Sequence, residues 1–229
     1  MSRTQLIETN NGSRDVVELT SSDDRQDERQ RALLKHFGIS LCTQYYLRLS
    51  LYTGNPLVDN DQVIVKPLTM DDADAFKALR LKAILDSPAS VWPTYEEEAR
   101  VTLENTRGRI RSTDTQIVFG AFSGTVLVGI VGLWREPLAQ VAHKAGLWGV
   151  FVEPARRGSG VARMLVEAAV AHARELKVLQ IHLCVHTENP RATRLYRSLG
   201  FVTYGLEPRA IRIGNRFYDE ERMMLRLDD

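Results

Sequence analysis

The fold is decided by residues 146–165, which read GLWGVFVEPARRGSGVARML, and by the helix and strand patterns that continue from there to Gly200. The stretch starts as an apolar run, turns at Arg156–Ala162 and enters a helical pattern. Gly158 and Gly160 have no Cβ, so a phosphate can approach their backbone closely. The start of a helix also presents free N–H groups and a positive dipole end. The turn therefore predicts an anion site, although a Gly-x-Gly alone is equally typical of a tight strand-to-helix turn.

Two familiar phosphate motifs do not fit this turn. A P-loop needs a lysine after its second glycine, and the dinucleotide fingerprint needs a third glycine where Arg163 stands. Arg156 and Arg157 instead add forked donors that suit phosphate oxygens.

The segments around this stretch predict a mixed sheet. A strand–helix–strand unit running from Leu147 to Val185 requires a parallel pair, whereas hairpin signals elsewhere predict antiparallel pairs. We therefore expect the α/β class, with a mixed, mostly antiparallel sheet and helices on both faces. The other expected elements are a strand at Val63–Pro67, a helix after Thr69, a helix from Thr94 to about Asn105, strands at Gln116–Phe122 and Val126–Trp134, a helix after Asn189, and strand-like segments at 201–206, 210–213, 216–218 and 221–227.

Residues 1–61 differ from the rest in composition. Residues 1–31 are polar and poor in apolar residues, so they predict partial disorder, which we place at residues 1–20. Residues 23–37 predict a short helix, and the alternation over 39–52 predicts a strand. We expect the compact domain to comprise residues 62–229.

Composition limits the classes of function. The net charge of +1 gives no basic field for nucleic acid. The apolar window Ile117–Trp134 contains a turn signal, which argues against a membrane span. Cys42 and Cys184 have no metal-ligand or paired spacing. With no signal-peptide pattern, we expect a cytoplasmic protein.

Two spaced motifs resemble a known family. Arg157-x-x-Gly160-x-Ala162 is similar to the [Gln/Arg]-x-x-Gly-x-[Gly/Ala] motif of the GCN5-related N-acetyltransferase (GNAT) superfamily. The run Asn189-x-x-Ala192-x-x-Leu195-Tyr196-x-x-x-Gly200-Phe201 resembles its downstream motif, and the segment from Glu207 to Met223 resembles the end of many bacterial members. The resemblance implies an acyl-CoA N-acyltransferase fold.

The resemblance also implies acetyl-CoA as cosubstrate, and we expect no metal. In this family the strand at Val150–Val152 splays from the strand at Leu179–Val185, and its free backbone groups pair with the pantetheine arm. Backbone N–H groups of the turn hold the pyrophosphate, and Asn189 contacts the arm, although an Asn before Pro is equally a helix cap. The expected cofactor-binding residues are Val150, Phe151, Val152, Arg156, Arg157, Gly158, Ser159, Gly160, Val161, Ala162 and Asn189.

The implied reaction is direct attack of an amine, small or peptidyl, on the thioester. Tyr196 holds the family's position for the acid that protonates the leaving thiolate; its alternative role is aromatic packing. An N–H of Phe151 or Val152 is expected to stabilise the oxyanion. The base stays open among His143, Glu153 and a water chain, because glutamate is missing from the first half of the strand at 146–152.

Other readings remain beside this one. The chain is alternatively a CoA-binding sensor or scaffold without catalysis, or it uses a longer acyl donor. A homodimer stays open, while nucleic acid and membrane partners are not expected. His182, Cys184 and His186 alternate onto one strand face, which we interpret as packing against a helix, and Glu96–Glu98 as a solvated helix start.

Overall fold

The computed structural model describes residues 3–8, 14–19 and 62–228. The chain divides into two units, Met1–Asp59 and Asn60–Asp229. The predicted helix at 23–37 and strand at 39–52 lie outside the described residues.

The first unit contains a β-hairpin where the sequence predicted disorder. Strands β1 (Arg3–Glu8) and β2 (Arg14–Leu19) pair antiparallel, with Leu6 opposite Val16. Disorder was predicted from the polar composition of the segment. Short runs of β-branched and apolar residues on either side of the Asn-Gly at 11–12 favour such a hairpin in spite of that polarity.

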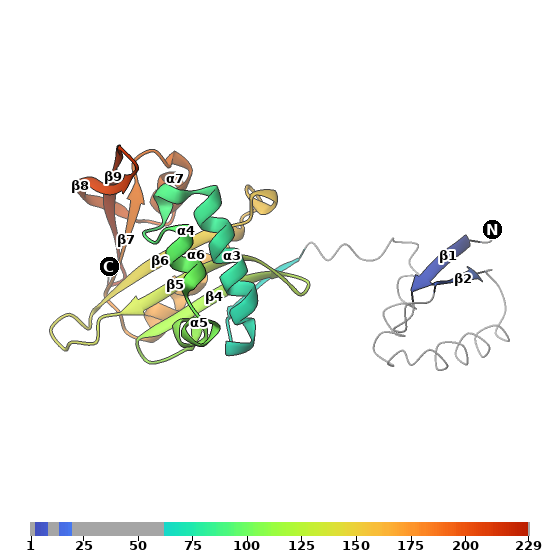
Figure 1. Ribbon diagram of the computed structural model, residues 1–229. Helices are drawn as coiled ribbons and strands as arrows, with labels where there is room; N and C mark the ends of the chain where they lie inside the picture. The colour runs from blue at the N-terminus through green and yellow to red at the C-terminus, as the bar shows by residue number, and fades with distance from the viewer. Residues whose placement is uncertain (1–2, 9–13, 20–61, 229) are drawn as a thin grey trace. The chain divides into compact units, whose positions relative to one another are not determined.

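The second unit is built on a seven-stranded sheet in the order β3-β4-β5-β6-β7-β9-β8 (Figure 1). Every neighbouring pair is antiparallel except β6–β7, which is parallel. The predicted mixed, mostly antiparallel sheet with one parallel pair is confirmed. The strands are β3 (Val63–Pro67), β4 (Gln116–Ser123), β5 (Val126–Arg135), β6 (Lys144–Val152), β7 (Gln180–His186), β8 (Val202–Ile213) and β9 (Arg216–Arg226).

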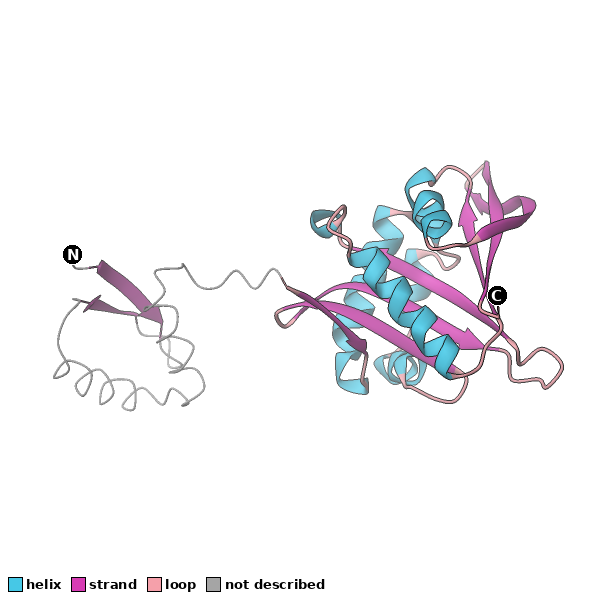
Figure 2. Cartoon of the chain, turned by 180° about the vertical axis from the view of Figure 1, so that it is seen from behind, coloured by secondary structure: helices cyan, strands magenta, loops and turns pink. Residues whose placement is uncertain are grey.

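Helices cover both faces of this sheet, as expected. Figure 1 shows α3 (Ala73–Asp86), α4 (Tyr95–Arg100) and α5 (Leu103–Ile110) in front of the strands. Seen from behind in Figure 2, α6 (Val161–Glu175) lies across the opposite face, with α7 (Pro190–Ser198) beside it.

The two faces have separate hydrophobic cores. Leu165 and Ala169 of α6 are fully buried in one core, and Phe76 of α3 and Ile110 of α5 are fully buried in the other. The sheet is therefore buried on both sides over β4, β5 and part of β6. Among the described residues, no helix is both long and apolar enough to span a bilayer.

The single helix predicted from Thr94 to about Asn105 is wrong; the structure has two. Thr94 caps α4, its Oγ1 accepting the Glu97 N–H at 3.2 Å. Thr102 then accepts the Asn105 N–H at 3.2 Å and begins α5, which continues to Ile110. A threonine side chain that bonds to the backbone three residues ahead starts a helix rather than continuing one.

The C-terminal segments join into two long strands. The short strand segments predicted at 201–213 are one strand, β8, interrupted by irregularities between Thr203 and Gly205 and between Glu207 and Ile211. Such bulges break the local pairing without ending a strand, and they hid its continuity in the sequence pattern.

Candidate functional site

The two central strands β6 and β7 separate after a short contact. Their register ends at the pair Gly146–His182, after which β6 stays paired with β5 while β7 stays paired with β9. A cleft of about 900 Å³ opens between them, lined by Leu147–Val152 on one side and Leu183–His186 on the other.

A bulge in β6 accounts for the separation. The register between β5 and β6 shifts between Ile130 and Gly132, and Gly149 adopts a left-handed φ of +63° there. An extra residue bends the bulged strand and ends its pairing locally, and glycine takes this conformation without a Cβ penalty. The sequence Trp148-Gly149-Val150 therefore bends β6 away from β7 at the point where the cleft begins.

The glycine turn lies at one end of this cleft. Gly160 is the N-cap of α6 with φ of +87°, and no side chain caps the helix. Ser159 Oγ is engaged elsewhere, donating to the Arg156 carbonyl at 2.7 Å. Within the described part of the chain, the N–H groups of residues 158–163 meet no acceptor, whereas those of Arg156 and Arg157 bond to Glu153 and Pro154 carbonyls at 2.9 and 3.2 Å. A run of free donors at a helix N-terminus is suited to an anion.

The two arginines of the turn make contacts within the fold. Arg157 Nε donates to the Val152 carbonyl at 3.1 Å, and its guanidinium pairs with Asp86 at the end of α3. This hydrogen bond, together with the nearby positive charge, holds the pKa of Asp86 below its usual range. Arg156 Nη2 donates to Ser123 Oγ at 2.9 Å. The pair thus fixes the turn against its surroundings.

Tyr196 of α7 and Asn189, the N-cap of α7, both line the cleft. Tyr196 is 6% exposed, lines the cleft and packs edge-to-face on Phe201 with ring centres 5.8 Å apart. Burial raises the pKa of its phenol, so it carries its proton at neutral pH. Asn189 also lines the cleft, and its Oδ1 caps α7 by accepting the Ala192 N–H at 3.1 Å.

A match to a family model decides which protein family the chain belongs to. Residues 80–201 match the model of the acetyltransferase (GNAT) family. The chain belongs to this family.

Relatives in this family cover different shares of the chain. The N-alpha-acetyltransferase RimI of Mycobacterium tuberculosis is 32% identical over 161 residues, which is 68% of this chain and 88% of that protein. A mycothiol acetyltransferase of Thermobispora bispora is 33% identical over 142 residues, which is 59% of this chain and 45% of that protein. The chain therefore spans less than half of the length of this second relative.

Solved structures agree with the fold. A ribosomal-protein-alanine N-acetyltransferase of Brucella melitensis has a TM-score of 0.61 and 26% identity over 72% of this chain and 99% of its own. A putative acetyltransferase of Salmonella typhimurium, solved with acetyl-CoA, has a TM-score of 0.65 and 21% identity over 73% and 95%. The latter likeness concerns the fold.

The sequence reasoning assigned no base role to two titratable side chains of the cleft, Glu220 and His186. His186 of β7 stands opposite Glu220 of β9, and both line the cleft. Glu220 is 5% exposed, and burial raises its pKa, although Trp92 donates a hydrogen bond to its carboxylate. Burial lowers the pKa of His186, whose Nδ1 is buried without a hydrogen-bond partner in the described structure. Both groups are proton acceptors in reach of the cleft.

The two residues that the sequence offered as general base, Glu153 and His143, do not line the cleft. Glu153 carries an ion pair to Lys82 at 2.6 Å, and His143 precedes β6; neither lines the cleft. The contacts of the His182–Cys184–His186 face are with Tyr204, Arg222 and Tyr218 of β8 and β9. The alternate residues Ile181, Leu183 and Val185 belong to the core that includes α6, and of the polar face Cys184 and His186 line the cleft.

Proposed function

We propose that this protein is an N-acetyltransferase that transfers the acetyl group of acetyl-CoA to a primary amine by direct attack. The observation that carries the proposal is the run of unpartnered N–H groups at residues 158–163, which lies at the end of the cleft where β6 and β7 part. A diphosphate is the chemistry that such a run binds best.

The backbone of the cleft supports the same assignment. Glu153 N–H bonds to the Val128 carbonyl at 2.9 Å, so strand alternation turns the Phe151 N–H toward β5 and the Val152 N–H toward the cleft. Val152, rather than Phe151, is therefore the donor we assign to the thioester oxyanion. Val150 and Val152 line the side along which a pantetheine arm would pair.

The reaction forms one bond and breaks one. The amine nitrogen bonds to the acetyl carbon, the carbon–sulfur bond breaks, the amine loses a proton and the thiolate gains one. We assign the proton that reaches the sulfur to Tyr196, which is protonated because it is buried. Glu220 or His186 accepts the proton that leaves the amine, since both line the same cleft as Tyr196.

The test is a turnover assay on the purified chain. Acetyl-CoA is incubated with a panel of small amines and peptides, free thiol is followed continuously, and the acetylated product is identified by mass. Thiol release that depends on an amine, with one acetyl group added to it, supports the proposal. Tight CoA binding without turnover on any amine would support a sensor instead, and absent CoA binding would remove both.

A further inference from the structure

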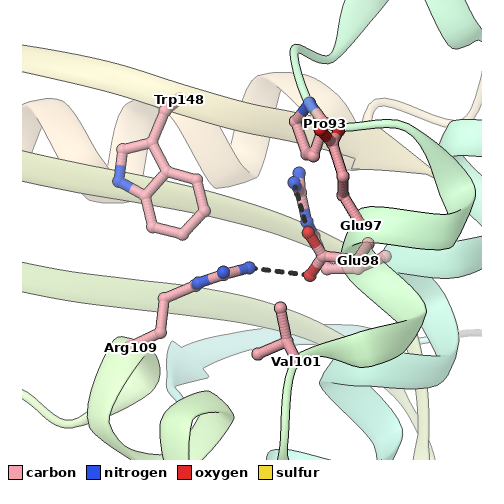
Figure 3. A pocket seen from close by; sticks show the side chains of 7 residues that line it. Pro93, Glu97, Glu98, Val101, Arg109 and Trp148 are labelled. Carbon is pink, nitrogen blue, oxygen red and sulfur yellow. Dashed lines mark hydrogen bonds and ion pairs between the residues drawn. The ribbon is translucent and has the colours of Figure 1, made fainter.

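A second hollow lies on the α3–α5 face of the sheet. It has a volume of about 480 Å³ and is lined by seven residues, of which Figure 3 shows Trp148, Pro93 and Val101 forming its apolar walls. The charged members are Arg80 of α3, Glu97 and Glu98 of α4, and Arg109 of α5, so the hollow lies where the three helices of this face meet.

Two guanidinium groups share one carboxylate in this hollow. Glu98 is 2% exposed; its Oε1 accepts from Arg109 Nη1 at 2.7 Å, and its Oε2 meets Arg80 Nη2 at 3.5 Å (Figure 3). Glu97 also lines the hollow, and its ionised carboxylate caps the start of α4 by accepting the Thr94 N–H at 2.7 Å. Arg80, Glu98 and Arg109 by themselves sum to one positive charge, and Glu97 brings the lining as a whole to neutral.

Arg80 keeps donors without a partner. Its side chain is 5% exposed, and its Nε is buried and bonds to nothing in the described structure. Arginine remains charged when buried, and a buried donor that is left unpaired is costly. An anion that reached these donors would satisfy them.

The hollow adjoins the place where β6 leaves β7. Trp148 lines both the hollow and the cleft, and the Arg80 guanidinium lies 5.9 Å from its ring centre. Arg80 also lies against the bulge: if residue 149 had a side chain, its Cβ would be 3.1 Å from Arg80 Nη1. An anion held here therefore lies on the helix side of the strand along which we place the acetyl thioester.

We propose that this hollow, defined by Arg80, Glu98, Arg109 and Trp148, binds a carboxylate of the acceptor, so that the acceptor is an amine that also carries a carboxylate. This inference rests on the proposed function. A carboxylate adds a single negative charge to this balanced lining, whereas a phosphate monoester would bring about −1.5 to −2 at neutral pH. The planar fork of arginine also matches the two carboxylate oxygens.

The test compares matched acceptors. The turnover assay is run on free amino acids and on the amines that remain when each loses its carboxylate, such as lysine with cadaverine or ornithine with putrescine. We expect kcat/KM to be about 10- to 100-fold higher for the member with the carboxylate, the range for hydrogen bonds to charged groups. Equal values within pairs, or turnover confined to amines without a carboxylate, would overturn the inference while leaving the proposed function standing. No turnover on any amine would instead contradict the proposed function.

Variants separate anion binding from support of the fold. Arg109→Gln leaves Arg80 and Glu98 as a neutral pair, so KM for the amino acid should rise about tenfold while kcat/KM for its decarboxylated partner changes less than twofold. Arg109→Lys should recover much of the loss. Arg107→Gln is the matched control, because Arg107 is on the same helix, pairs with exposed Glu104 and does not line the hollow. An equal loss for both acceptors would mean that Arg109 only supports the fold.

Discussion

Tyr196 and Glu220 line the same cleft, and burial raises the pKa of both above the ordinary value. For each group this favours the protonated, neutral form. The phenol therefore keeps the proton that we assign to the leaving thiolate. The carboxylate binds a proton more tightly than an exposed one does, which suits a group that must take a proton from an amine.

Replacing the phenol tests its role. We expect Tyr196→Phe to lower kcat by about 100-fold, within the usual range for general acid catalysis. Acetyl-CoA affinity, measured by calorimetry, should change less than twofold because the ring still packs on Phe201. Tyr95→Phe is the control, since Tyr95 is exposed on α4 and does not line the cleft. An unchanged kcat would remove Tyr196 from the mechanism.

Glu220 links activity and stability through pH. Because its folded pKa is raised, the folded state binds more protons than the unfolded state between the ordinary glutamate pKa and the raised one, and stability falls as pH rises through that window. We expect Glu220→Gln to be more stable than the parent to urea at pH 7, and to be less active.

The pH profile completes this test. A general base must be deprotonated, so kcat/KM of the parent should fall as pH drops through the raised pKa of Glu220, and the variant should lose this limb. A limb that persists in Glu220→Gln would point to His186, whose side chain stands opposite on β7.

Two elements together create the proposed cofactor site. The bulge at Gly149 bends β6 out of its pairing with β7, and Gly160 begins α6 without a side-chain cap. Neither element alone is enough: a paired β6 would close the cleft, and a capped α6 would have fewer free donors for an anion.

The N-terminus of α6 gives a matched pair of variants. Gly160→Asp places a carboxylate beside the donors that we assign to the pyrophosphate, so acetyl-CoA affinity should fall by about tenfold or more. Gly160→Asn imposes the same left-handed strain at φ of +87° with an uncharged side chain of similar size. The Asp variant should bind more weakly than the Asn variant at low salt, with the difference shrinking at high salt. Equal affinities would place the phosphates elsewhere.

At the scale of the whole molecule, the elements that build the site all lie in the second unit. The seven-stranded sheet and both cores fall within residues 62–228. The described part of residues 1–61 consists of the paired strands β1 and β2.

A truncation tests this division. We expect residues 62–229 to unfold in one cooperative transition, with acetyl-CoA affinity within twofold of the full chain, because the cores and the glycine turn are retained. Circular dichroism and calorimetry on both proteins provide the measurement. Aggregation of the shorter chain, or a loss of affinity, would show that residues 1–61 support the domain.

The sequence alone determined the fold class, the cap at Asn189, the turn at Arg156–Ala162 that leads into a helix, and the assignment to the family. These depend on local signals. They are glycines that permit a turn, capping side chains that bond to a backbone N–H three residues ahead, and apolar residues that recur with the period of a helix or a strand. A residue whose structural role depends only on partners a few positions away in the chain can be predicted from the sequence.

The tertiary structure decided which polar side chains meet. Glu98 was interpreted as part of a solvated run, yet it is buried between Arg80 and Arg109 from two other helices. Glu220 faces His186 only because β9 pairs with β7 in one register, and a shift of one residue would turn it to the other face. Pairings between residues far apart in the chain follow from how helices and strands pack, which no local pattern encodes.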